Sequence, residues 1–469
     1  MTGARDLPKP SGIIFGLHDR PGPGTSLLAA SQHVLASIVG IVTPTLIIGG
    51  ALGLGSHIPY LISMSLFVSG VATFIQCRRI GPVGSGLLSL QGTSFAFLGA
   101  ILTAGFAVKG RGGTPEDILA MIFGLCLAGC LIEVVLSQFV DKLKRIITPT
   151  VTGIVIAVIG LSLVKVGFTD LAGGVGAKDL GNPVNLALGL TVIAVILALS
   201  FQRNIYLRIS AVLIGLIVGF VIAMFLGKVN FGAIGGQPIF ALPRPFMFGL
   251  SFDWALFLPI AFLYLVTAIE TTGDLTANST ISGEPVKGPV YLSRIRGGIL
   301  ADGVNSGLAA IFNTFPNTTF SQNNGVIQMT GVASRHVGMY TAAILVVLGL
   351  FPIFAAIFTI IPKPVLGGAT LVLFGSIAVA GIRILANQAI TRKAVYVMAV
   401  SFGLGLGVAL VPDALKGLPD VAQKVLGSPI TLAGLAAILM TLILPDDAED
   451  RALAAEEEPE PASVTPATA

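Results

Sequence analysis

The sequence predicts an all-α polytopic membrane protein with about fourteen transmembrane segments. Apolar residues make up 54% of the 469 positions and charged residues only 11%. A soluble globular domain has about 25% charged residues, so this composition excludes that class. The 58 glycines agree with a membrane protein, because small residues let transmembrane helices approach closely and permit broken helices.

The expected segments are apolar runs near the length of roughly 20 residues that a helix needs to cross the hydrocarbon core. They cover residues 26–49, 58–76, 86–105, 115–138, 146–165, 183–201, 209–227, 253–272, 290–311, 318–331, 338–361, 364–382, 394–411 and 427–444. The tenth is too short to span a membrane alone. Residues 1–25 are expected to form a cytoplasmic tail that is not a cleaved signal peptide, and the acidic residues 446–469 a disordered cytoplasmic tail.

The positions of Lys and Arg give an orientation that does not depend on the apolar count. With the N-terminus in the cytoplasm, 18 basic residues fall on the inner side and 9 on the outer side, which together make the 27 in the chain. An even number of segments with both termini inside is therefore favoured. The expected location is the inner (plasma) membrane of a cell.

The third and tenth segments occupy equivalent places in two sets of seven, and both are interrupted. Polar and small residues break LLSLQGTSFAFLGA and NTTFSQNNGVIQMTG near the middle of the membrane. Paired interruptions of this kind are typical of an inverted-repeat transporter whose solute site lies between half-helices. The alternative, two glycine-kinked packing helices, does not account for so many amide and hydroxyl groups.

Carboxylates inside or beside apolar runs are the first candidate functional groups, since each costs about 2.5 to 3.5 kcal/mol on insertion scales. Glu270 and Asp274 are one helical turn apart and share a face, where they could accept the N–H donors of a heterocycle or carry a proton. Asp302, in the middle of a segment, could relay a proton or clamp two helices. The structural alternative for the first two is pairing with a basic residue: Arg294, Arg296 or Lys287.

Few other side chains suggest chemistry. His33, in the first segment, could orient one of the carboxylates or satisfy a hydrogen bond between helices. The remaining histidines have no metal-ligand spacing, and the three cysteines are interpreted as packing thiols. No Walker loop, HExxH or GxSxG motif occurs, so the sequence does not support an enzyme. We expect a carrier of a small polar solute, with no metal.

The run QNNGVIQMTG, from Gln322 to Gly331, resembles the signature of the nucleobase-ascorbate transporters, also called nucleobase:cation symporter-2 proteins. Other stretches resemble further landmarks of that family: ETTGDLTANSTISGEPV from Glu270, ADGVNSGLAA from Ala301, QGTSFAF from Gln91 and SQHVLA from Ser31. The similarity covers about residues 26–444. It points to the bacterial xanthine and uric acid permease branch.

The resemblance implies a fold and a mechanism. The fold is a seven-plus-seven inverted repeat in which residues 26–138 and 251–361 form a core domain and residues 139–250 and 362–445 a gate domain. Family members import a nucleobase with a proton, by an elevator-like alternation between the two sides of the membrane, and usually as homodimers. The implied partners are a purine and the lipid bilayer, with no nucleic acid and no cofactor other than the coupling proton.

The resemblance also assigns residues. Gln at the start of the signature goes with xanthine and urate carriers, Glu with uracil carriers and Pro with ascorbate carriers, so Gln322 points to a purine. Ser94 matches a position where urate-capable members have a small hydroxyl residue. The implied substrate-binding residues are Glu270, Gln322, Ser94, Phe95, Phe320 and Ser321; those implied in proton coupling and transport are Glu270, Asp274, Asp302, His33 and Asn323.

Alternatives within transport remain. A carrier of uracil or another nucleobase, an anion transporter of the same fold, and a passive channel share most of these sequence features. An anion site should present basic groups, whereas Glu270 repels an anion unless it is protonated. Urate is itself mostly a monoanion near neutral pH, so its binding beside Glu270 requires a protonated carboxyl group or compensation by helix dipoles. Whether the carrier prefers urate or xanthine is left open.

Overall fold

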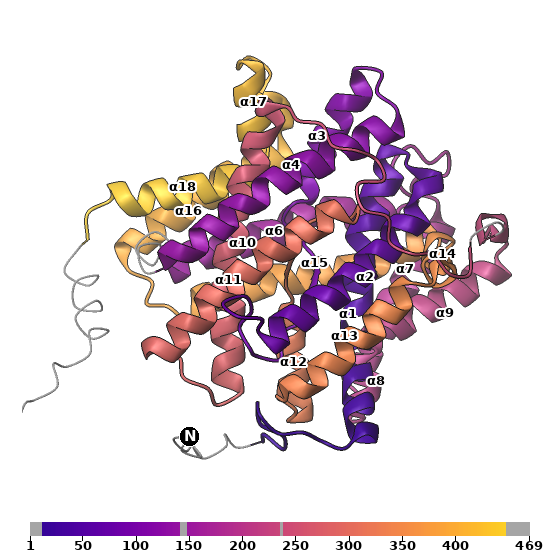
Figure 1. Cartoon of the computed structure of the whole chain (residues 1–469). Coiled ribbons are helices and arrows are strands. Elements are labelled where there is room, and N and C mark those ends of the chain that lie inside the picture. Colours follow the sequence, from indigo (N-terminus) through magenta and orange to yellow (C-terminus); the bar gives the residue numbers. More distant parts are fainter. Residues whose placement is uncertain (1–11, 141–147, 235–237, 447–469) are drawn as a thin grey trace, which may run out of the picture.

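The computed structural model of the chain describes residues 12–140, 148–234 and 238–446 (Figure 1). Residues 1–11, the basic cluster at 142–145 and nearly all of the acidic tail at 446–469 lie outside this part of the chain. Within it the protein is mostly helical. Eight helices are long and apolar enough to cross a membrane, or nine if one bent pair counts as a single span. The count of fourteen crossings therefore stays a prediction.

The helices overlap every expected segment. Those of the first half are α1 (Pro23–Leu52), α2 (Ile58–Arg78), α3 (Leu98–Gly110), α4 (Pro115–Leu136), α6 (Pro149–Leu171), α7 (Pro183–Ser200), α8 (Ile205–Ile209) and α9 (Ala211–Phe225). Those of the second half are α10 (Trp254–Ile281), α11 (Gly288–Ile311), α12 (Ser321–Thr330), α13 (Arg335–Gly349), α14 (Pro352–Thr359), α15 (Lys363–Ala386), α16 (Arg392–Leu410), α17 (Asp420–Leu426) and α18 (Pro429–Ile443). Helices α13 and α14, bent by 77°, take the place of a single eleventh segment.

Helix starts follow local chemistry. At α4 the Thr114 hydroxyl accepts the Asp117 N–H, and the Asp117 carboxylate accepts the Thr114 N–H in return, which forms a capping box. At α10 the Asp253 carboxylate accepts two backbone N–H groups of the first turn. This cap fixes the start of the helix that carries Glu270 and Asp274.

In the described part of the chain, one pair of short strands interrupts the expected all-helical architecture, near the centre of the molecule. Strands β1 (Gln91–Thr93) and β2 (Asn317–Thr319) pair in antiparallel fashion, with Gly92 opposite Thr318. Pairing satisfies backbone groups that no water or lipid reaches at this depth, which explains why extended chain is tolerated here. Each strand is followed within a few residues by a short helix, α3 and α12 respectively.

Gly92 allows the ring of Phe320 to approach β1 closely. A Cβ atom there would lie 2.6 Å from Cε1 of Phe320 and 2.9 Å from Cγ1 of Ile41. Only a glycine leaves room for the Phe320 ring between β1 and α1. The ring is thereby held where β2 continues into α12.

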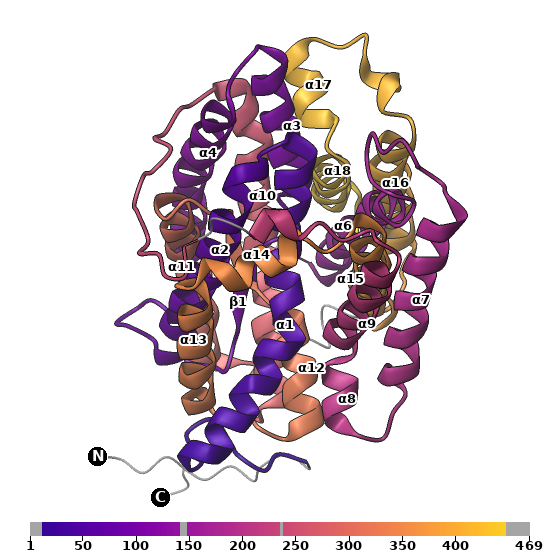
Figure 2. The ribbon, with the colours of Figure 1, turned by 90° about the vertical axis from the view of Figure 1, so that its right-hand side faces the viewer.

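Helices α6, α7, α9, α15 and α16 lie on one side of the molecule, and α1, α2, α4, α11 and α13 on the other (Figure 2). Helices α6 and α15 pack at very short range, because Gly160 and Gly381 leave space for the backbone of the partner helix. These two helices also face β1, β2 and α10 across a cavity described below. Which helices form the expected core and gate domains, and where these domains begin and end, stays a prediction.

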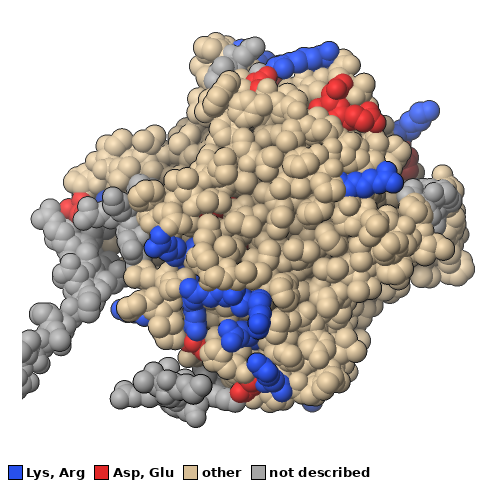
Figure 3. Space-filling model, in the orientation of Figure 1, with Lys and Arg blue, Asp and Glu red and all other residues tan. Residues whose placement is uncertain are grey.

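The surface agrees with a chain surrounded by lipid. Most of the face in Figure 3 carries no charge; Lys and Arg side chains gather over its lower left, and most of its other charged side chains lie at the upper right. Many large apolar side chains are exposed, among them Leu131, Phe168, Leu190 and Val379. Exposed apolar area of this extent is expected of a protein whose solvent is a bilayer.

Candidate functional site

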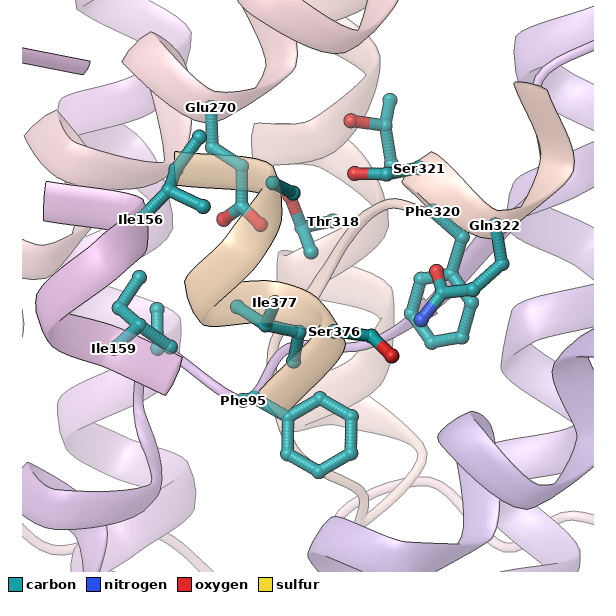
Figure 4. Close-up of a pocket in the computed structure, with 13 residues that line it drawn as sticks. Phe95, Ile156, Ile159, Glu270, Thr318, Phe320, Ser321, Gln322, Ser376 and Ile377 are labelled. Atoms are coloured by element: carbon teal, nitrogen blue, oxygen red, sulfur yellow. The ribbon is translucent and has the colours of Figure 1, made fainter. Parts of the chain in front are cut away.

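A cavity of about 220 Å³ lies between the two groups of helices (Figure 4). It is smaller than the roughly 300 to 1,000 Å³ of sites for drug-sized ligands, and so suits a small solute. Helix α10, the segments after β1 and around β2, helix α6 and helix α15 all contribute. The lining residues are Phe95, Ala96, Ile156, Ile159, Glu270, Thr318, Thr319, Phe320, Ser321, Gln322, Ser376, Ile377 and Ala380.

Glu270 brings a carboxylate into this cavity from the middle of α10 (Figure 4). Its side chain is partly exposed, and its Oε2 atom is buried without a hydrogen-bond partner. Arg294 pairs with Glu284 at 2.6 Å, and Arg296 donates to Gln138, so neither arginine neutralises Glu270. An acceptor-only group without an internal partner is available to the N–H donors of a solute.

The start of α12 forms another wall. Phe320, Ser321 and Gln322 line the cavity, and the Gln322 amide lies at its edge (Figure 4). No side-chain hydrogen bond caps this helix, and the positive end of its dipole lies at residues that line the cavity. Gln322 adds an amide that can donate and accept at once.

Phe95 supplies the aromatic face of the cavity from the segment after β1. Its ring meets that of Phe374 on α15 edge-on, with centroids 5.5 Å apart and planes at 84°. Such an edge contact leaves a ring face free for another flat molecule. The Phe95 side chain is 7% exposed, in agreement with its place in the cavity wall.

Ser94 is beside the cavity but its side chain does not line it. The Ser94 Oγ atom accepts the backbone N–H of Ala96 at 3.3 Å, and the Ser94 N–H donates to the carbonyl of Pro316 at 2.8 Å. The residue therefore shapes the loop that presents Phe95 and Ala96. Its expected part in substrate selection stays a prediction.

Asp302 lies outside the cavity and is completely buried. It accepts hydrogen bonds from Gln91 of β1 at 2.8 Å, from Gln76 of α2 at 3.3 Å and from Thr271 of α10. The carboxylate thus ties α11 to three other elements, which fits the clamp alternative and leaves the relay alternative open.

Asp274 faces a second, larger cavity of about 630 Å³. Its carboxylate accepts hydrogen bonds from Ser321 at 2.7 Å and Thr319 at 3.0 Å, and both of these hydroxyl residues line the first cavity. Ile156 belongs to the walls of both cavities. Glu270 and Asp274 therefore share a helix face, as expected, but open into different spaces.

His33 and Asn323 are not among the residues that line the first cavity. Both side chains are buried, and they are neighbours. Asn323 donates to the carbonyl of Leu88 at 2.6 Å, whereas neither ring nitrogen of His33 has a hydrogen-bond partner. Among the described residues, His33 consequently orients none of the carboxylates through a direct hydrogen bond.

A buried carboxylate near these groups has no part in the sequence-based expectations. Glu133 of α4 is fully buried; Thr267 of α10 donates to its Oε1 atom at 3.1 Å, and its Oε2 atom has no partner. The signal was present, because Glu133 is a lone acidic residue in the apolar run GLCLAGCLIEVVL. Its carboxyl group interacts electrostatically with those of Asp302 and Glu270.

Comparisons with known proteins show the family of the chain. A sequence-family model described as "Permease family" matches residues 24–414. The chain is 46% identical over 443 residues to the xanthine permease XanP of Escherichia coli K12, which covers 93% of this chain and 96% of the relative. It is 44% identical over 439 residues to the xanthine permease XanQ of the same strain, with 93% and 94% covered.

Among solved structures, the transmembrane domain of the cyanobacterial bicarbonate transporter BicA is similar with a TM-score of 0.59 and 18% sequence identity. The match covers 88% of this chain and 99% of that domain. At this identity the likeness shows a shared transporter fold and nothing about the solute. Together with the sequence matches it shows that the chain, a multi-pass membrane transporter and not an enzyme, belongs to the permease family of the nucleobase-ascorbate transporters.

Proposed function

We propose that this permease imports an oxopurine, xanthine or uric acid, together with a proton. The observation that supports it best is a carboxylate without an internal partner, Glu270, in the same small cavity as the amide of Gln322 and the ring of Phe95. The names of the relatives XanP and XanQ, at 46% and 44% identity, agree with such a solute.

The chemistry of the cavity fits one edge of a purine dione. Glu270 accepts ring N–H donors, while Gln322 both donates to a carbonyl and accepts an N–H. Phe95 offers a face for stacking. Leaving one buried polar group of the solute unpaired costs about 1 to 3 kcal/mol, which separates oxopurines from adenine-like bases. The carboxylate of Glu270 and the amide of Gln322 thus select oxopurines over adenine-like bases.

Urate adds a negative charge that has to be balanced. Among the described residues that line the cavity there is one carboxylate, Glu270, and no Lys, Arg or His. Urate binding therefore requires a protonated Glu270 or compensation by the positive end of α12. The same composition speaks against a dedicated anion carrier, despite the fold shared with a bicarbonate transporter.

Proton coupling and an elevator-like mechanism complete the proposal. The core domain, residues 26–138 and 251–361, carries the carboxylates past the gate domain, residues 139–250 and 362–445. One observation supports an inverted repeat of fourteen segments: strands β1 and β2 pair antiparallel from equivalent positions of the two sevens.

The larger cavity bears on the state of the carrier. It is lined by Thr280 near the end of α10 and Tyr291 near the start of α11, which belong to the side expected to be cytoplasmic. The arrangement suits a carrier open to the inside.

The proposal also includes two cytoplasmic termini and a homodimeric assembly. Reporter fusions at each end test the orientation, and cross-linking in membranes tests the assembly. A reporter active only outside the cell would contradict the orientation.

Uptake of radiolabelled xanthine into cells that express the protein tests the function. We expect uptake that rises with an inward proton gradient, and competition by unlabelled xanthine and urate but not by uracil, adenine or bicarbonate. Uracil as the strongest competitor would assign the chain to uracil transport. Uptake that is insensitive to the proton gradient and faster than carrier turnover would assign a channel instead.

A further inference from the structure

The buried Asp302 is linked to more than its clamping partners. Its Oδ1 atom accepts from two glutamine amides, Gln76 and Gln91, while its Oδ2 atom accepts from the hydroxyl of Thr271. An amide N–H cannot pass on a proton without becoming charged, whereas a hydroxyl both donates and accepts. The Oδ2 atom and Thr271 therefore form the side of this carboxylate from which a proton can leave.

A line of hydroxyl groups continues from that side. The Oγ1 atom of Thr319 lies 3.4 Å from Oγ1 of Thr271 and 3.0 Å from Oδ2 of Asp274. Asp302, Thr271, Thr319 and Asp274 thus form one hydrogen-bonded series from α11 through α10 and β2. Thr271 is completely buried and Thr319 is 2% exposed, so bulk water does not compete within the series.

The two ends of the series differ in their access to water. Asp302 is completely buried, whereas Asp274 is partly exposed and lines the cavity of about 630 Å³. Thr319 has a single hydroxyl hydrogen, so it donates to Thr271 or to Asp274 but not to both at once. The series consequently has two orientations of its hydroxyl groups, one suited to a proton on each end.

The charged groups around the series are acidic. On α10 itself Glu270 precedes Asp274 by one turn, and on α4 the carboxylate of Glu133 is an electrostatic neighbour of Asp302. His33 of α1 lies next to Asn323 and has no contact with the series. In the described parts of the chain, no Lys or Arg is hydrogen-bonded to either end. Ionised carboxylates gathered in such a site repel each other, so a mobile proton lowers the energy.

We infer that the hydroxyls of Thr271 and Thr319 relay the coupled proton between Asp302 and Asp274, and so to the cavity on the expected cytoplasmic side. The inference rests on the proposed proton symport. In the transfer Asp302 gives its proton to Thr271 Oγ1, Thr271 gives its hydroxyl proton to Thr319, and Thr319 gives its own to Asp274 Oδ2. Both hydroxyls end neutral, and one negative charge moves from Asp274 to Asp302.

The geometry sets the demanding step. Hydroxyl-to-oxygen hydrogen bonds are usually 2.5 to 3.0 Å long, so the 3.4 Å link between the two threonines has to shorten during transfer. Such contacts tighten when a site closes around its substrate. The relay therefore operates in the loaded carrier, which couples proton release to the presence of the solute.

The test compares Thr271→Val, which removes the hydroxyl at nearly constant volume, with Thr271→Ser, which keeps it. Thr319→Val and Thr319→Ser form a second pair, and Thr341→Val is the matched control, because the buried Thr341 hydroxyl donates to a carbonyl of its own helix. Two quantities are measured with radiolabelled xanthine: accumulation driven by a proton gradient, and exchange with xanthine inside the cell, which needs no net proton movement.

We expect Thr271→Val to lose accumulation by about 100-fold, the lower end of the contribution of a positioned proton-transfer group, while exchange persists. Thr319→Val should lose accumulation to the same extent; its exchange is not used as a control, because Thr319 lines the substrate cavity. The Ser variants and Thr341→Val should retain both activities. A Val variant that only folds badly loses exchange as well, and the amount of inserted protein together with the second threonine pair identifies that case. If wild-type accumulation ignores the gradient, the proposed symport fails; if it responds and the Val variants respond equally, the relay is wrong.

Discussion

Replacing Glu270 with Gln is the sharpest test of the cavity. The side chain keeps its size, and because the Oε2 atom has no partner within the protein, no internal hydrogen bond at that atom is lost. What changes is the hydrogen bonding of the solute. A solute N–H group that donates to a carboxylate oxygen of Glu270 would face the NH₂ group of the glutamine and lose its acceptor. That costs about 1 to 3 kcal/mol, which is roughly 5- to 150-fold in affinity at 1.4 kcal/mol per factor of ten.

The measurement is binding and uptake of radiolabelled xanthine by membranes that contain equal amounts of wild-type protein and Glu270→Gln. Binding should weaken within that range, and gradient-driven uptake should fall further, because an amide does not ionise and so cannot take up and release the coupled proton. Glu116→Gln is the matched control, since Glu116 lies exposed at the start of α4 with His57 as its partner at 2.9 Å. Near-normal, pH-dependent uptake by Glu270→Gln would show that the carboxylate does not contact the solute.

Further changes probe the other walls. Gln322→Glu removes a donor and places a second carboxylate in the cavity, so inhibition by oxopurines should weaken; an unchanged inhibition profile across xanthine, urate and uracil argues against contact. Ser94→Asn should reduce urate uptake more than xanthine uptake, by roughly 1 to 2 kcal/mol for one hydrogen bond plus crowding; an equal reduction of both removes the serine as discriminator. Gly92→Ala places a Cβ atom 2.6 Å from Cε1 of Phe320, and should cost about 1 to 3 kcal/mol in the stability of the detergent-solubilised protein. Gly99→Ala, where the added atom meets open space, is its control, and equal melting temperatures for the two variants contradict the packing argument.

Much of the site could be predicted because its residues are close together along the chain. Glu270 and Asp274 share a face through helical periodicity alone, and Phe320, Ser321 and Gln322 are neighbours in one motif. Glu133 shows what could not be predicted. The sequence shows a lone acidic residue in an apolar run, but nothing near it in the chain indicates that Thr267 of α10 lies opposite it. Which side chains of different helices come into contact depends on how the helices pack, and the hydropathy of the sequence does not show that.

The sequence by itself determined the class of the protein and the apolar character of its segments. These properties depend on composition and on local periodicity, which act within a few residues. Only the tertiary structure decided which carboxylate faces which space: Glu270 the small cavity, Asp274 the larger one, and Asp302 neither. It also joined β1 to β2 and Thr271 to Thr319. Such contacts link residues far apart in the chain, and their free energy exists only once the helices between them have packed.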